Sequence, residues 1–225
     1  MYKILMVDLE VQNHPYYGQV ASSFHPDNYI VAPGWRVDTV NDDGSVTVGE
    51  THTRYFNSKA ESEAGSDWFD AVDDCSLMVA HNAAFEIKWF ISSYRDKFES
   101  FIKRGGRVLC TAMGHYLLSH QQDLYPALGE IAPSYGAGHK VDGVKILWEQ
   151  GALTADIDKD LLLEYLGGPS GDIDNTATVF YSQMGQLAAA NMVSMFYERC
   201  DSILAFAYCE WFGLHVDMDL SLIHI

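Results

Sequence analysis

The sequence predicts an α/β protein in which a mixed sheet carries helices on both of its faces. Three observations support this. The chain opens with the apolar run Ile4–Val7, which is typical of a strand covered on both sides. Two later apolar segments, 77–81 and 107–110, are each followed by a stretch whose large side chains have helical spacing. The last third of the chain is helical in pattern, and strands followed by helices are typical of a mixed sheet.

The individual elements follow from the same periodicity. "NDDGSVTVGE" predicts an exposed hairpin that turns at Asp43 and Gly44. The polar middle section, which contains Pro126, Pro133, Gly136 and Gly138, is expected to be rich in loops. The expected strands cover residues 2–9, 19–24 or 29–31, 51–56, 77–81 and 107–110. The expected helices cover residues 62–72, 83–94, a segment from 111, 158–166, a segment from 172, and the apolar stretch after 188.

Composition narrows the classes of function. The chain has 225 residues and a formal net charge of -17, so it should repel a phosphate backbone unless bound divalent cations reverse the local field. The chain has no apolar run long enough to span a membrane and no signal-peptide pattern. The four cysteines are scattered and fit neither a disulfide framework nor a zinc site. A cytoplasmic protein is therefore expected.

Two carboxylates stand out at the end of the first strand. In "VDLE", Asp8 and Glu10 lie two residues apart, so both side chains emerge on one face, while Leu9 between them points to the core. Hard oxygen ligands favour Mg²⁺ or Mn²⁺. Taken alone, the pair has a plainer explanation, since an acidic pair can end a strand by chance.

Two further acids begin predicted helices. Glu86 follows a strand in "HNAAFE", where Asn82 could cap the helix, and Asp172 follows the glycine-rich "GGPSG". Each could be only a favourable charge in the first turn of its helix. Asp174 is an alternative to Asp172. Together with Asp8 and Glu10, however, the acids form an ordered set of motifs along the chain.

This order resembles the exonuclease superfamily that is named for its four acidic residues. The resemblance implies a ribonuclease-H-like fold, removal of 5′-mononucleotides from 3′ ends, and two Mg²⁺ (or Mn²⁺) ions roughly 3.5–4 Å apart. By the same resemblance, Asn82, Phe85 and Leu9 would border the terminal nucleotide. The implied metal ligands are Asp8, Glu10, Glu86 and Asp172.

A narrower resemblance concerns residues 110–142 and 161–180, which look like the proofreading module of phage-type family A DNA polymerases. Two departures stand out. The family has Asp where this chain has Glu86, although a longer carboxylate can still reach a metal ion. The subfamily also has Tyr four residues before its last Asp, where this chain has Gly168; a related subfamily has His where this chain has Gly167. Tyr165 is then the candidate for orienting the attacking water, provided that the "GGPSG" loop returns it to the site; the alternative is a tyrosine packed on its own helix.

The domain organisation follows from this resemblance. Residues 1–188 are expected to form the exonuclease domain, and 189–219 resemble the entry to a polymerase half that is itself missing. Residues 220–225, "LSLIHI", are one translation of CTGTCTCTTATACACATC, which resembles a sequencing adapter, so this tail is expected to be foreign to the protein. The implied partners are a single-stranded DNA 3′ end and the polymerase half, in the cytoplasm of a phage-infected bacterium.

Two other functions remain open at this stage. One is a free-standing 3′→5′ exonuclease that acts on RNA. The other is a degenerate domain without catalysis that braces a polymerase, which the replacement by Glu86 and the altered tyrosine spacing would favour.

Overall fold

A six-stranded mixed sheet forms the centre of the molecule, in a computed structural model that describes residues 1–124, 126–138, 143–213 and 216–217. The strand order is β3-β2-β1-β5-β6, with β4 paired to β2. This confirms the predicted α/β class. The strands are β1 (Tyr2–Val11), β2 (Ile30–Val40), β3 (Val46–Thr47), β4 (Thr51–Thr53), β5 (Leu77–Ala80) and β6 (Arg107–Cys110).

The register of β1 determines where the acidic side chains point. β1 pairs with β2 antiparallel and with β5 parallel, and β5 pairs with β6 in parallel, so β1, β5 and β6 end at the same edge of the sheet. The run Ile4–Val7 is fully buried, as predicted. Asp8 lies opposite Gly34 and Glu10 opposite Ala32, while Leu9 between them is 4% exposed and belongs to the core.

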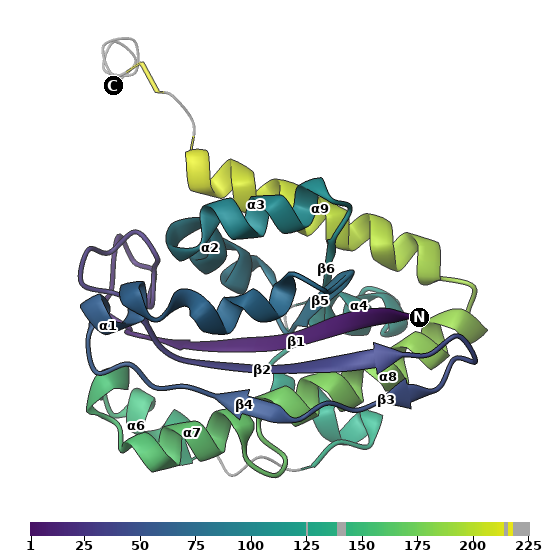
Figure 1. Cartoon of the computed structure of the whole chain (residues 1–225), viewed down its shortest axis with the longest axis horizontal. Coiled ribbons are helices and arrows are strands. Elements are labelled where there is room, and N and C mark those ends of the chain that lie inside the picture. Colours follow the sequence, from purple (N-terminus) through teal and green to yellow (C-terminus); the bar gives the residue numbers. More distant parts are fainter. Residues whose placement is uncertain (125, 139–142, 214–215, 218–225) are drawn as a thin grey trace.

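Helices cover both sides of the sheet. Figure 1 shows α2, α3 and α9 above the strands and α6, α7 and α8 below them. The α-helices are α1 (Lys59–Ala64), α2 (Ala84–Ser93), α3 (Arg95–Lys103), α4 (Thr111–Leu118), α5 (Leu128–Ile131), α6 (Gly143–Glu149), α7 (Lys159–Gly167), α8 (Asp172–Ala189) and α9 (Val193–Phe212). The 3-10 helices are η1 (Ser66–Val72), η2 (Ala132–Tyr135) and η3 (Thr154–Asp156).

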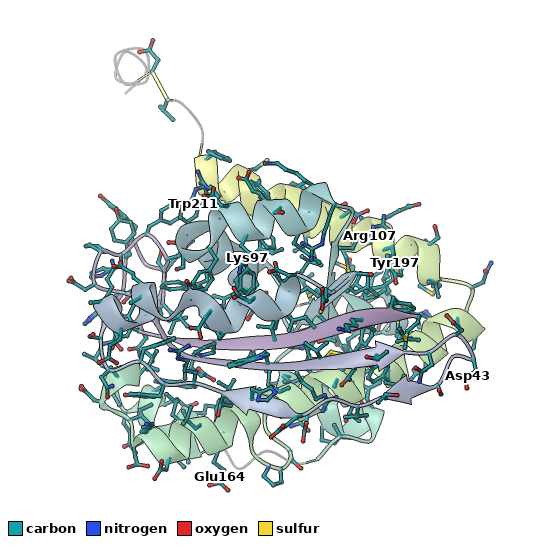
Figure 2. All side chains as sticks on the ribbon, in the orientation of Figure 1. Asp43, Lys97, Arg107, Glu164, Tyr197 and Trp211 are labelled. Atoms are coloured by element: carbon teal, nitrogen blue, oxygen red, sulfur yellow. The ribbon has the colours of Figure 1, made fainter. Side chains whose placement is uncertain are left out.

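The long last helix, α9, packs on the same core as the rest of the chain. Phe196 and Cys200 are buried in it. At its beginning, the Arg107 guanidinium lies over the Tyr197 ring at 5.0 Å, and these side chains appear together in Figure 2. At its end, the Trp211 ring stacks on Phe24 with 4.8 Å between ring centroids. These contacts hold both ends of α9, and the helix also packs against α2 and β6.

Several predicted elements need correction. Of the two alternatives for the second strand, residues 19–24 are not a strand, because Tyr17, Gly18 and Ala21 have positive φ and turn the chain repeatedly, whereas 29–31 overlaps the start of β2. The expected helix 62–72 breaks at Gly65, where a Cβ would lie 2.4 Å from the Phe56 ring. The loop-rich middle contains the short helices α5 and α6. The predicted tail 220–225 lies outside the described residues.

Other boundaries are confirmed closely. The strand 107–110 and the helix start at Thr111 fall where the sequence places them. The hairpin turns at Asp43 and Gly44, with Gly44 at φ 82°. Within the described residues, no helix is both long and apolar enough to cross a membrane.

Candidate active site

Three carboxylates converge at the edge where the parallel strands end. One ligand oxygen from each of Asp8, Glu10 and Asp172 lies within 4.8 Å of the others. Asp8 and Glu10 come from alternate positions of β1, and Asp172 is the first residue of α8 after the Gly171 N-cap. Glu10 and Asp172 are buried, at 8% and 6% exposure. The structure thus unites residues that lie more than 160 positions apart in the sequence.

Glu86 contributes a fourth carboxylate to the same place. It lies in the first turn of α2, is 3% exposed and lines the same pocket, although it is outside the three-residue cluster. Its Oε2 atom is buried and has no hydrogen-bond partner among the described residues. Burial, and then the negative charge of Asp8, raise the pKa of Glu86 well above its ordinary value; Glu10 and Asp172 add to this.

This donor set fits a divalent cation. Carboxylate oxygens are the ligands that Mg²⁺ and Mn²⁺ prefer, and a buried, unbonded carboxylate oxygen is costly unless something binds it. A cation between the four groups would remove the like-charge repulsion that raises the pKa of Glu86. Asp8, Glu10 and Asp172 could therefore hold a metal ion, with Glu86 facing it.

The carboxylates line a pocket of about 390 Å³, here called the carboxylate pocket. Part of its remaining wall is aromatic and basic: Phe85 comes from α2, Lys145 and Trp148 from α6, and Tyr165 from α7. The two rings from different helices meet edge to face, with 5.7 Å between the centroids of Trp148 and Tyr165. Leu9 also borders the pocket. Such a wall suits a flat base and a phosphate group.

Tyr165 reaches the pocket because the "GGPSG" segment is a tight turn. The Gly171 N–H donates to the Gly168 carbonyl at 2.8 Å, and the Asn175 side chain donates to the Ser170 carbonyl at 2.8 Å. A Cβ at Gly168 would lie 2.5 Å from the Glu164 carbonyl oxygen, so position 168 has no room for a side chain. The tyrosine of the resembling subfamily could not stand there, and Tyr165, three residues earlier, faces the pocket instead.

Asn82 differs from its expected role, whereas His81 is held at the end of its strand. Asn82 has φ 60° and does not cap α2; Ala83 occupies the N-cap position. Asn82 lines a neighbouring pocket between α4 and α9 rather than the carboxylate pocket. Both ring nitrogens of His81 are engaged, one with Thr111 Oγ1 and one with the Pro126 carbonyl, each at 2.8 Å. His81 therefore braces the end of its strand at the wall of the carboxylate pocket.

Asp174 belongs to a different cluster. Its side chain accepts from Arg36 Nη1 at 2.6 Å and from Thr51 Oγ1 at 3.3 Å. The structure thus places Asp172, and not Asp174, among the converging carboxylates. Trp148 was missed by sequence reasoning; its only signal is an aromatic residue in an otherwise mixed segment between Gly143 and Gly151.

With this geometry, the chain can be compared with known proteins. Neither protein-family models nor curated protein sequences give a match. Solved structures do. The chain is similar to NrnC from Brucella melitensis bound to pGG, at 12% identity and TM-score 0.61, over 93% of this chain and 85% of that chain. It is also similar to Brucella melitensis NrnC with bound Mg²⁺, at 11% identity and TM-score 0.57, over 93% and 86%.

A polymerase shares the fold as well. The family B DNA polymerase of the archaeon Pyrobaculum calidifontis matches at 12% identity and TM-score 0.55, over 91% of this chain but 27% of that chain. These likenesses confirm the expected ribonuclease-H-like fold. They do not support the narrower expectation of a phage-type family A polymerase module.

The likeness to NrnC extends into α9. The part of the chain that it leaves uncovered is 7%, or about 16 residues, which is fewer than the 20 residues of α9. At least part of this helix therefore belongs to the shared fold.

Proposed function

We propose that the chain is a metal-dependent 3′→5′ exonuclease that removes 5′-mononucleotides from short single strands, RNA included, as a free-standing enzyme. The observation that carries the proposal is the meeting of Asp8, Glu10 and Asp172 within 4.8 Å, with the buried Glu86 beside them. The fold shared with the nuclease NrnC supports it, because those matches cover 85% or more of a whole protein chain.

Each pocket residue has a proposed role in hydrolysis. Asp8, Glu10, Glu86 and Asp172 hold divalent cations, whose chemistry would be to lower the pKa of a water molecule and neutralise the scissile phosphate. The Tyr165 phenol hydrogen-bonds that water and aligns it with the phosphorus atom. The aromatic and basic walls hold the terminal nucleotide: Trp148 and Phe85 contact its base, and the Lys145 ammonium meets a phosphate.

A polymerase-linked proofreading exonuclease is the second candidate. The observation that favours it is the likeness to the family B polymerase, in which this fold is a 27% portion of a longer chain. In that case the substrate would be a mismatched DNA 3′ end and the partner a polymerase region. A non-catalytic brace, the remaining alternative, has less support because the acids converge.

The test uses 5′-labelled seven-nucleotide RNA and DNA strands and a DNA duplex with a mismatched 3′ end, each with Mn²⁺, and the isosteric Asp8→Asn variant as control. Stepwise shortening from the 3′ end, with release of 5′-mononucleotides, is expected for the unmodified protein and should disappear in Asp8→Asn. Shortening of RNA at a rate comparable to DNA supports the free-standing enzyme; action on mismatched DNA alone supports proofreading. Internal cuts, or an unimpaired Asp8→Asn variant, would overturn the proposal.

Tyr165→Phe separates water orientation from metal binding. Loss of one positioned hydroxyl should slow shortening about tenfold or more while Mn²⁺ still raises the melting temperature. A Tyr165→Phe variant with full activity would show that this tyrosine only packs against Trp148.

A further inference from the structure

A second pocket lies beside the carboxylate pocket, between α4 and α9. It has a volume of about 310 Å³ and is here called the α4–α9 pocket. Two segments of the chain line both pockets. In the turn from β5 to α2, Phe85 and Glu86 face the carboxylates, whereas Asn82 and Ala84 face the second pocket. The two pockets are therefore neighbours across one turn of chain.

The second shared segment follows α4. Leu124 lines the α4–α9 pocket, and the residues from Ala127 to Glu130 line the carboxylate pocket. A ligand that extends out of the carboxylate pocket past this turn would meet the α4–α9 pocket next.

The walls of the α4–α9 pocket are mainly apolar and aromatic. Tyr116 from α4 and Phe206 from α9 supply rings, and Met113 and Ile203 add aliphatic side chains. The polar and charged members of the lining are Asn82, Arg199, Ser202 and Glu210, of which Glu210 is already paired with Lys88 at 2.9 Å. Phe206 is 67% exposed and Leu124 is 65% exposed, so large apolar surface faces water here. A flat, weakly polar group such as a nucleobase would cover these side chains, and base–aromatic stacking does not depend on sequence.

The distribution of Lys and Arg side chains also supports a ligand that occupies these two pockets. The chain has 14 Lys and Arg residues against 31 acids. Within the described part of the chain, Lys145 and Arg199 are the two cations for which no ion pair, hydrogen bond or ring contact is recorded. Lys145 lines the carboxylate pocket, and Arg199 lines the α4–α9 pocket.

The positions of Lys145 and Arg199 are informative because the chain as a whole is acidic. Each of the other described cations already has a partner, so an added phosphate would have to compete for it. Lys145 and Arg199 can each meet a phosphate without giving up a contact.

We propose that the α4–α9 pocket binds an upstream nucleotide of the single strand whose 3′ end lies in the carboxylate pocket. The base packs against Phe206 and Tyr116, and a backbone phosphate pairs with Arg199. This inference rests on the proposed exonuclease function, and it assigns the substrate class: single strands long enough to cross the turn at Asn82, read without regard to sequence.

The test compares two substrates in four variants. Phe206→Ala and Arg199→Ala alter the α4–α9 pocket. Their matched controls are Phe212→Ala, a ring on the same helix that is 68% exposed and outside the pocket, and Lys103→Ala, an exposed cation on α3. One substrate is a 5′-labelled seven-nucleotide strand. The other is the p-nitrophenyl ester of thymidine 5′-monophosphate, which has no upstream nucleotide.

The pocket variants should change only the handling of the long substrate. Phe206→Ala and Arg199→Ala should raise KM for the seven-nucleotide strand about fivefold or more, as loss of one stacked base would, while kcat/KM for the ester stays within about twofold. Arg199→Ala should also weaken the salt dependence of strand binding by about one unit of slope. Both control variants should match the unmodified protein on both substrates.

Other outcomes are equally decisive. Equal KM values for Phe206→Ala and Phe212→Ala on the strand would overturn the inference, as would a loss on both substrates alike. A Phe206→Ala effect on self-association, with no effect on strand binding, would assign the pocket to a second copy of the chain instead.

Failure of the proposed exonuclease function can be distinguished from failure of the proposed α4–α9 binding site. If the unmodified protein cleaves neither substrate, strand binding is measured by fluorescence anisotropy in EDTA. Binding that Phe206→Ala weakens and Phe212→Ala does not would keep the subsite while the exonuclease proposal fails. An unmodified protein that binds no strand would overturn both.

Discussion

Two aspartates in the first turn of α8 illustrate two ways to accommodate a cluster of negative charges. Asp174 meets Arg36, whose guanidinium also grips Asp38 through two bonds of 2.9 and 3.1 Å. Asp172, two residues earlier, lies within 4.8 Å of Asp8 and Glu10, and the charges recorded around their neighbour Glu86 are all negative. One cluster has its cation built into the chain; the other is arranged so that a cation from solution would complete it.

This difference indicates that the Arg36 cluster supports the fold, whereas the carboxylate cluster is suited to binding a ligand. The Arg36 cluster joins β2 to α8 and is satisfied without any ligand, since Asp38 also accepts from Tyr181 and from the Gly49 N–H. The carboxylate cluster keeps like charges together at an opening in the fold, an arrangement that costs stability unless a ligand binds. Substitutions in the two clusters should therefore have opposite signatures.

The largest effect is expected for Arg36→Met. This change leaves Asp38, which is 0% exposed, as an uncompensated buried charge, so the free energy of unfolding should fall by about 3–5 kcal/mol. Urea denaturation measures it. The double variant Arg36→Met with Asp38→Asn should recover part of the loss; no loss in the single variant would mean that the cluster does not depend on its built-in cation.

Asp172→Asn and Asp174→Asn form a matched pair on one helix. Asp172→Asn should lower the proposed exonuclease activity at least about 100-fold, because a proposed metal ligand is removed, without lowering stability in metal-free buffer. Asp174→Asn should cost about 1 kcal/mol of stability and leave activity within a few-fold. Activity and urea denaturation of both variants test this, and the reverse pattern would exchange the roles of the two clusters.

Mn²⁺ should neutralise the charges of the carboxylate cluster, as Arg36 neutralises those of its own cluster. At ten times its dissociation constant it should stabilise the protein by about 1.4 kcal/mol, seen as a higher melting temperature. The effect should vanish in Asp172→Asn and persist in Asp174→Asn. Equal stabilisation of both variants would place the ion elsewhere.

The smallest effect concerns pH and the Arg36 cluster. The Tyr181 phenol donates to Asp38 Oδ2 at 2.9 Å; burial, and then the Asp38 charge, raise the pKa of Tyr181 above 10.0. Because the folded pKa is higher, this stability is complete below about pH 10 and is lost as the pH rises further.

The loss is small because Tyr181 is only half buried. Allowing for solvent screening, it should amount to about 0.5 kcal/mol between about pH 9.5 and 10.5. In Tyr181→Phe, the free energy of unfolding should not show this decrease between the two pH values, as measured by urea denaturation at both. Tyr17→Phe, at a site that is 92% exposed, should retain it.

Local patterns in the sequence predict much of this fold. The apolar run Ile4–Val7, the strand 107–110 and the turn at Gly44 each depend on neighbours in the chain, so their own residues determine them. The carboxylates of β1 were also predictable, because strand alternation places Asp8 and Glu10 on one face whatever surrounds them.

What the sequence left open depends on the three-dimensional course of the backbone and on its packing. Arg36 and Asp174 are 138 residues apart, and only packing of α8 on β2 shows that Asp174 is already paired. Position 168 resembles a site for tyrosine until the Glu164 carbonyl is seen to fill the space. Asn82 looks like a helix cap, yet its positive φ turns it toward the α4–α9 pocket. No local pattern encodes these arrangements.

The distribution of the cysteines allows the protein to be labelled with a fluorescent dye at one position. Cys75, Cys110 and Cys200 are buried. Burial raises the pKa of the Cys75 thiol to about 11, and it also raises the pKa of the Cys110 thiol, so the buried thiols should resist alkylation. Cys209 is exposed on α9, next to Glu210 at the rim of the α4–α9 pocket. A single maleimide dye attached there would need no engineered site, and its brightness could record each arrival and departure of a strand, one molecule at a time.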